Sequence, residues 1–163
     1  MKKYFIILLS LFLLTGCQTR KTDVNVDEQL YQQYQDYYTK LKKAKDFENK
    51  ISDCSVSLIL NKTNNDNIRY DIIIDNPQIK MTNIQAIAFV EDETKYNPPS
   101  IGLLEKETFS LQPGVIDKEN GIYKGINLSG MTSLKEITVK VYLTYKKQDK
   151  LIERYIELHD NAS

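Results

Sequence analysis

Hydrophobic positions divide the 163-residue chain into three regions that differ in spacing. The first is an apolar run from Tyr4 to Leu14, which follows Lys2 and Lys3 and is broken only by Ser10. About 12 helical residues span about 18 Å, whereas a bilayer core needs about 20 apolar residues. The run is therefore too short to cross a membrane. Its basic start and the small residues at its end are typical of a secretory signal peptide.

The second region, residues 26–50, has helical spacing. Its apolar side chains recur at steps of three and four, and neither Pro nor Gly interrupts them. The stripe covers barely two heptads, which is too few for a coiled coil. The predicted amphipathic helix must bury this face, either on the domain that follows or on another protein. The stripe consists of Leu30, Tyr31, Tyr34, Tyr37, Tyr38, Leu41 and Ala44.

In the third region, residues 51–160, the period falls to two, as in β-strands. Residues 84–92 are instead nearly all apolar, which is typical of a strand covered on both faces. Turn signals such as Asn76-Pro77 and Pro113-Gly114 separate about seven such segments. The pattern predicts a mainly β fold, an immunoglobulin-like antiparallel β-sandwich of about seven strands preceded by one amphipathic α-helix. The Cys and Trp marks of true immunoglobulin domains are missing, so the likeness is one of architecture.

The end of the apolar run carries a more specific signal. Residues 14–17, Leu-Thr-Gly-Cys, resemble the lipobox of bacterial lipoproteins. The resemblance implies that the Cys17 thiol is joined to a diacylglycerol and that the chain is cut between Gly16 and Cys17. One acyl chain holds a protein only marginally, whereas two hold it stably. We therefore expect a signal peptide over residues 1–16 and a lipidated tether over residues 17–25.

The lipobox also predicts where the protein acts. We expect it on the extracytoplasmic face of the cell membrane, or at the outer membrane if the organism has one. Removal of residues 1–16 leaves 147 residues, which suits one domain. It also removes two lysines, so that 22 acidic side chains outnumber 20 basic ones. We expect a monomer that contacts the membrane through its lipid and has no nucleic-acid partner, because no basic face is evident.

Residue types that build catalytic sites are scarce. His159 is the only histidine and lies near the C-terminus, where chains fray. With Cys17 assigned to lipid, Cys54 can form no internal disulfide, and we predict that it is buried as a small apolar side chain. Acidic residues such as Asp71 and Glu93 fall mainly on outward strand positions and turns, where solvation is expected. We therefore predict no catalytic residue, no cofactor and no metal, with a carboxylate-based hydrolase as the least favoured alternative.

Two segments are candidates for binding. The first is the tyrosine-rich face of the predicted helix, which is either a docking surface for the domain or an exposed platform for a sugar or a protein. We favour burial, because an isolated helix of this length is only marginally stable in water.

The second is the loop "YNPPSIGLL" at 96–104, since loops on rigid scaffolds often carry recognition. Its predicted partner-contact residues are Tyr96, Pro98, Pro99 and Ile101. The alternative, in which this loop folds back and plugs one end of the sandwich, stays open.

The function predicted from these observations is that of a non-catalytic lipoprotein. Its β-sandwich would be displayed as a binding or interaction module, with an envelope protein or a glycan as partner. The alternative is a structural or accessory subunit of a membrane-associated complex for transport, secretion or envelope assembly. In that case the helix would pair with another protein.

Overall fold

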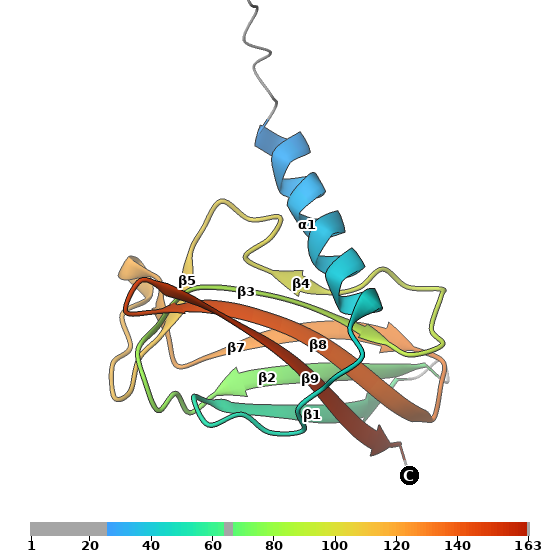
Figure 1. Ribbon diagram of the computed structural model, residues 1–163. Coiled ribbons are helices and arrows are strands. Elements are labelled where there is room, and N and C mark those ends of the chain that lie inside the picture. The colour runs from blue at the N-terminus through green and yellow to red at the C-terminus, as the bar shows by residue number, and fades with distance from the viewer. Residues whose placement is uncertain (1–25, 64–66, 163) are drawn as a thin grey trace, which may run out of the picture.

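The computed structural model describes residues 26–63 and 67–162, and in this part of the chain nine strands form two sheets stacked face to face (Figure 1). This confirms a mainly β sandwich preceded by one helix, while its immunoglobulin-like character stays a prediction. In chain order the elements are α1 (Val26–Lys43), β1 (Ser55–Lys62), β2 (Ile68–Asp75), β3 (Met81–Val90), β4 (Ser100–Ile101), β5 (Phe109–Leu111), the 3-10 helix η1 (Lys118–Asn120), β6 (Ile122–Tyr123), β7 (Gly125–Thr132), β8 (Glu136–Lys147) and β9 (Lys150–Asn161).

The smaller sheet has the strand order β1-β2-β7, with both pairs antiparallel. Its inward side chains alternate as the sequence predicts, and Ile72 and Ile74 on β2 are fully buried. Leu128 on β7 lies opposite Ile72 and is equally buried. This face of the sheet forms one wall of the main core.

The larger sheet has the order β6-β5-β3-β8-β9, and β4 also pairs with β3. Its pairs are antiparallel except for the short parallel pair of β5 and β6. A bulge interrupts β3 near its start, where Asn83 has a positive φ of 51°. Strands β8 and β9 form a long hairpin, and its two turn residues, Gln148 and Asp149, also have positive φ.

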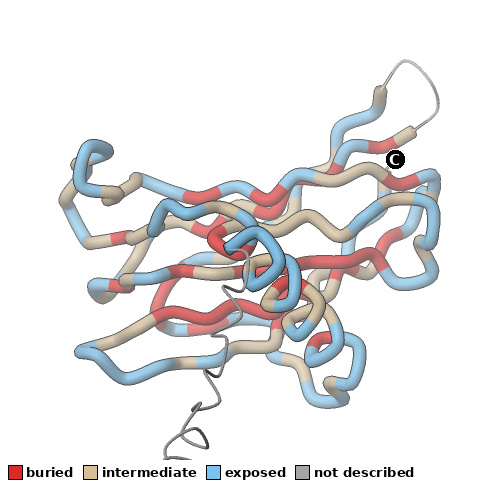
Figure 2. The backbone as a smooth tube through the Cα atoms, turned by 90° about the horizontal axis from the view of Figure 1, so that it is seen from above, coloured by how far each residue is buried: buried red, intermediate tan, exposed pale blue. Residues whose placement is uncertain are grey.

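Strand β3 is covered on both of its faces, as its continuous apolar run predicts. Ala86, Ala88 and Val90 face the core between the sheets. Ile87 and Phe89 face the opposite way, into a second cluster beneath α1. Figure 2 shows the helix crossing over strands whose residues are largely buried.

The helix docks on its own domain, with Tyr34 and Leu41 buried in this second cluster. Tyr37 and Tyr38 are half-buried against it, so most of the tyrosine-rich face is a docking surface. Tyr31 differs, because it is 60% exposed.

The helix ends at Lys43, seven residues earlier than its predicted end at 50. Phe47 continues the apolar spacing after Ala44 and packs against the same cluster as the helix, so the spacing alone does not show where the helix ends. The backbone of Glu48 instead forms two hydrogen bonds with β9. The Glu48 N–H donates to the Tyr155 carbonyl oxygen (2.8 Å), and the Glu48 carbonyl oxygen accepts from the Glu157 N–H (2.9 Å). Ile51 then enters the main core.

Two of the nine strands were not separated by the sequence pattern. The two-residue β4 lies inside the predicted loop 96–104. Residues 121–130, a stretch that begins and ends with glycine, are divided at Lys124 into β6 and β7. The reason is that β6 pairs with β5 in the larger sheet and β7 pairs with β2 in the smaller one, so the chain changes sheets at Lys124.

Candidate functional site

A hollow of about 290 Å³ lies between α1 and the loop that connects β3 to β4. One wall comes from the helix, one from that loop, and the floor from strand residues of the sandwich. It brings together residues far apart in the sequence, which alternate between aromatic rings and polar groups. Those lining it are Tyr34, Gln35, Tyr38, Lys42, Tyr70, Phe89, Val90, Glu93, Thr94, Tyr96, Asn97, Pro98 and Met131.

Hydrogen bonds fix both ends of the loop that forms one wall. At the helix side the Tyr34 hydroxyl donates to the Pro98 carbonyl oxygen (2.9 Å). At the other side one carboxylate oxygen of Glu93 accepts from the Thr132 hydroxyl (3.0 Å) and the Ser133 N–H (3.2 Å). The hollow is therefore built largely before any ligand arrives, which favours binding because less ordering remains to be done.

The surroundings of Glu93 and Tyr34 also set their protonation states. Partial burial alone would raise the pKa of Glu93, but backbone hydrogen bonds from Lys95 and Ser133 outweigh it and hold this pKa below its ordinary value. Burial raises the pKa of the Tyr34 phenol, so its hydroxyl stays a proton donor at neutral pH.

Aromatic rings form one part of the hollow's surface. Tyr38 meets Phe89 edge to face, with 6.1 Å between ring centroids. The Lys42 ammonium lies over the Phe89 ring, 4.8 Å from its centroid. Aromatic walls with a few polar groups suit a small ligand that combines an apolar face with hydroxyl or anionic groups.

The four predicted partner-contact residues have different places. Tyr96 and Pro98 line the hollow. The Pro99 carbonyl instead accepts from the Ala88 N–H (3.0 Å), beside β4. Ile101 packs against the main core. The loop thus divides between a lining part and a packing part, and its Leu103 is fully buried in the cluster beneath α1.

Several lining residues were not predicted, because they come from separate elements. Gln35 and Lys42 belong to α1, Phe89 to β3 and Met131 to β7. One signal was present for Lys42, which follows Tyr38 by four positions and so shares its face of the helix. The strand residues carry no such signal without the pairing of the strands.

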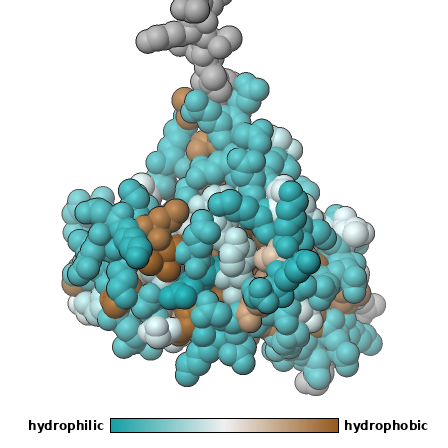
Figure 3. Space-filling model, viewed as in Figure 1, coloured by the Kyte–Doolittle hydropathy of each residue, from teal (hydrophilic) through white to brown (hydrophobic). Residues whose placement is uncertain are grey.

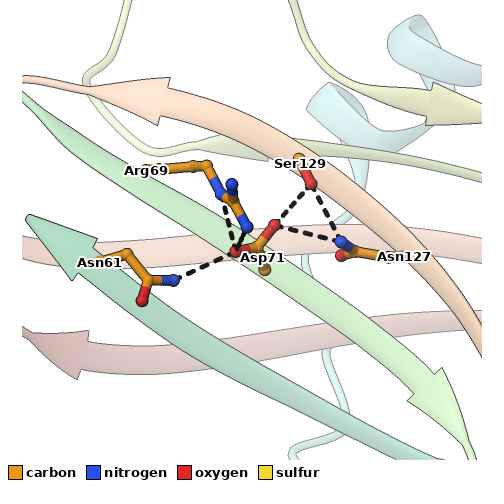
Figure 4. Close-up of polar contacts among 5 residues, drawn as sticks. All are labelled: Asn61, Arg69, Asp71, Asn127 and Ser129. Atoms are coloured by element: carbon orange, nitrogen blue, oxygen red, sulfur yellow. Dashed lines mark hydrogen bonds and ion pairs between the residues drawn. The ribbon is translucent and has the colours of Figure 1, made fainter. Parts of the chain in front are cut away.

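A second polar site lies on the outer face of the smaller sheet, centred on Asp71 of β2 (Figure 4). One of its carboxylate oxygens accepts from Asn61 (3.2 Å) and from two nitrogens of Arg69 (2.9 and 2.8 Å). The other accepts from Asn127 (3.1 Å) and from the Ser129 hydroxyl (2.5 Å). These donors come from all three strands of the sheet, so the network joins β1, β2 and β7.

The expectation of a solvated surface acid is wrong for Asp71, which is only 4% exposed. Its neighbours on the adjacent strands cover it. Burial alone would raise the pKa of Asp71, but hydrogen bonds from Ser129, Arg69 and Asn127 and the charge of Arg69 hold it below its ordinary value. A fully bonded, ionised carboxylate stabilises the sheet and is a poor proton donor.

A third cluster lies around Asp53, which is also buried. The Tyr145 hydroxyl donates to it (2.5 Å), and Lys147 (3.5 Å) and Arg154 (3.9 Å) are its ion-pair partners. The hydrogen bond from Tyr145 is the main reason that the pKa of Asp53 lies below its ordinary value, with help from both cations against the effect of burial. The cluster ties the segment after α1 to β8 and β9.

Residues 26–63 and 67–162 contain no group of three or more His, Cys, Asp or Glu arranged to hold a metal. This part of the chain also has no helix of the length and hydropathy that a membrane crossing requires. Cys54 is buried, as predicted, and burial raises the pKa of its thiol to about 12. Gly16, Cys17 and the rest of the predicted signal and tether lie outside the described residues.

Comparison with known proteins adds one finding. No curated protein and no solved structure matches the chain. Residues 1–18 match the family model for the prokaryotic membrane lipoprotein lipid attachment site. The match covers the run in which Leu14 to Cys17 resemble a lipobox, and it confirms that resemblance. The chain therefore carries a prokaryotic lipoprotein lipid attachment site at its N-terminus, which supports anchoring to a membrane through lipid.

Proposed function

We propose that this lipoprotein is a non-catalytic binding module displayed on the extracytoplasmic face of the membrane, and that the hollow between α1 and the β3–β4 loop receives its ligand. The observation that carries the proposal is the hollow itself. It is bounded by anchored elements and lined by aromatic rings beside Lys42, Glu93 and Asn97. Its chemistry favours a glycan fragment of the cell envelope, because sugar rings offer an apolar face and many hydroxyls.

The position of α1 supports this proposal over the accessory-subunit alternative. That alternative needs the apolar face of the helix for another protein. Tyr34 and Leu41 already pack this face against the chain's own sheet. A partner protein would therefore have to use a different surface.

The state of the carboxyl groups supports a non-catalytic role. A glycosidase needs one acid whose pKa is raised, so that it can donate a proton. Within the described residues, the carboxyl groups with a resolved shift are Asp53, Asp71 and Glu93, and each pKa is lowered.

The ligand proposal is tested by calorimetric titration of the full-length protein in detergent with peptidoglycan-derived sugars. We expect Lys42→Ala and Tyr96→Ala to raise Kd about tenfold or more, because each removes a large side chain that lines the hollow. Matched controls are Lys43→Ala and Tyr31→Ala, which change exposed residues of α1 outside the hollow. Equal effects in the lining and control variants, or no binding of any sugar, would overturn the proposal.

The proposed lipid anchoring and extracytoplasmic location are tested separately in cells. Cys17→Ser should abolish the incorporation of labelled palmitate and move the protein out of the membrane fraction. Added protease should degrade the native protein in cells whose outer face is accessible. A Cys17→Ser protein that still sediments with membranes would contradict anchoring through lipid.

A further inference from the structure

Exposed large hydrophobic side chains gather near one side of the helix. The described residues contain six of them, and two of the six, Val26 (51% exposed) and Leu151 (55%), line one groove of about 430 Å³. A third, Leu104 (48%), directly precedes Glu105, which also lines the groove. We call this groove, with Val26, Leu151 and the adjacent Leu104, the apolar rim.

The apolar rim joins three segments that are distant in sequence. These are the first turn of α1, the loop between β4 and β5, and the start of β9 after its turn from β8. In Figure 1 they occupy the upper end and the left of the molecule, and Figure 3 shows hydrophobic residues on that side among mostly hydrophilic ones.

The covalent chain places the membrane close to this rim. Eight residues separate Cys17 from Val26, the first residue of α1. At about 3.5 Å per residue, even an extended chain spans only about 30 Å from the lipidated sulfur to Val26. The lipid anchor therefore keeps the rim near the bilayer at a high effective concentration, so weak contacts are enough to fix its orientation.

We infer that the apolar rim lies on the bilayer surface, with Val26, Leu104 and Leu151 in the head-group region. This inference rests on the lipid anchor of the proposed function. Lys106 and Lys146 line the same groove, and their long side chains can rest on apolar surface while the ammonium groups meet lipid phosphates. Glu105 and Glu107 also line it, so apolar contact and not net charge would provide the attraction.

The absence of tryptophan from the chain permits a direct test. Leu104→Trp and Leu151→Trp each create a single reporter at an exposed site, where the fold tolerates a change of side chain. Ile59→Trp is the matched control, because Ile59 is 44% exposed but lies on β1, in the sheet remote from α1. Each full-length lipidated variant is placed in vesicles of phosphatidylethanolamine and phosphatidylglycerol, with and without brominated acyl chains.

We expect brominated lipid to quench both reporters on the rim about twofold and to leave the Ile59→Trp emission nearly unchanged, since tryptophan in the interface lies within reach of the chains. Flotation of the vesicles reports the anchor independently. If the variants float with the vesicles but the rim reporters are quenched no more than the control, the inference is overturned and the anchor stands. If the protein does not float, the anchor fails and the inference fails with it.

Discussion

Tyr34 of α1 and Pro98 of the β3–β4 loop, 64 positions apart, are joined by a hydrogen bond of 2.9 Å from the phenol to the carbonyl oxygen. The bond crosses the hollow's edge and connects its helix wall to its loop wall. It also uses the polar end of a side chain whose ring is buried in the docking face. One tyrosine therefore serves both the packing of the helix and the shape of the candidate site.

Tyr34→Phe should separate these two roles, because it keeps the ring and removes the donor. We expect a loss of about 1 kcal/mol in the free energy of unfolding, the usual value for one hydrogen bond. Amide hydrogen exchange in residues 93–97 should become faster while exchange in β8 stays slow. Tyr31→Phe, at an exposed position, should change neither quantity. Unaltered exchange in the loop of Tyr34→Phe would show that Tyr34 does not hold it.

Leu41→Ala tests the docking of the helix. Leu41 of α1 is 1% exposed, so its truncation leaves a cavity between the helix and the sheet. The free energy of unfolding, measured in urea, should fall by about 2–5 kcal/mol. Leu104→Ala, at a surface position, should cost less than about 0.5 kcal/mol. A small effect for Leu41→Ala would mean that the helix does not depend on this contact.

Asp71→Asn should make stability less sensitive to acid. The pKa of Asp71 is lower in the folded chain than in the unfolded one, so its contribution is complete above the unfolded pKa of about 3.9 and is lost as the pH falls through the folded value. At pH 7 the variant should lose about 2 kcal/mol, as for bonds to a charged group. This difference from the native protein should shrink below about pH 4.

The exposed residue Asp92 supplies the control for this experiment. It has a positive φ that asparagine tolerates, so Asp92→Asn should unfold like the native protein at every pH. A difference between Asp71→Asn and the native protein that persisted unchanged at pH 3 would contradict the assigned pKa direction.

Tyrosine ionisation should limit stability in alkali. Burial, and then the hydrogen bond to Asp53, raise the pKa of Tyr145 to about 12, and burial also raises the pKa values of Tyr70 and Tyr142. Above about pH 10 the unfolded chain loses these protons and the folded chain keeps them, so the folded state should lose stability as the pH rises. Absorbance at alkaline pH should show fewer ionised tyrosines in the native protein than in urea. Equal titration curves would contradict this.

Cys54 should react slowly with thiol reagents at pH 8 in the folded protein. Its side chain is buried and the pKa of its thiol is raised to about 12, so thiolate is scarce and inaccessible. Labelling should become fast in urea, which serves as the internal control. Rapid labelling of the native protein would show that this region opens readily.

The elements with strong periodicity were predictable from the sequence. The alternation in β8 places Val139, Val141 and Leu143 in the core, and the stripe on α1 identifies the face that docks. Local spacing determines which side of a helix or strand is apolar, and the apolar sides can pack against one another in only a few arrangements. The lipid attachment site could also be recognised from the sequence, because its characteristic residues are consecutive in the chain.

Features that depend on strand pairing were not predictable. The burial of Asp71 needs Ser129 of β7 directly opposite it, which no local pattern reveals. The division of β6 from β7 at Lys124 depends on which sheet offers a free edge. The hollow combines a helix, a loop and three strands. The sequence singled out Tyr34 and Tyr38 of the helix and Tyr96 and Pro98 of the loop as separate candidates, but it could not show that they share one site.

The bridge from Glu48 to β9 has a consequence for crowding. Lipid anchors concentrate proteins in a plane, where an open strand edge invites a neighbour to add its own strand. On β9 the Tyr155 carbonyl and the Glu157 N–H are already occupied by Glu48. At this point on β9 the segment after α1 therefore leaves neither group free to pair with a strand from another copy on the same membrane.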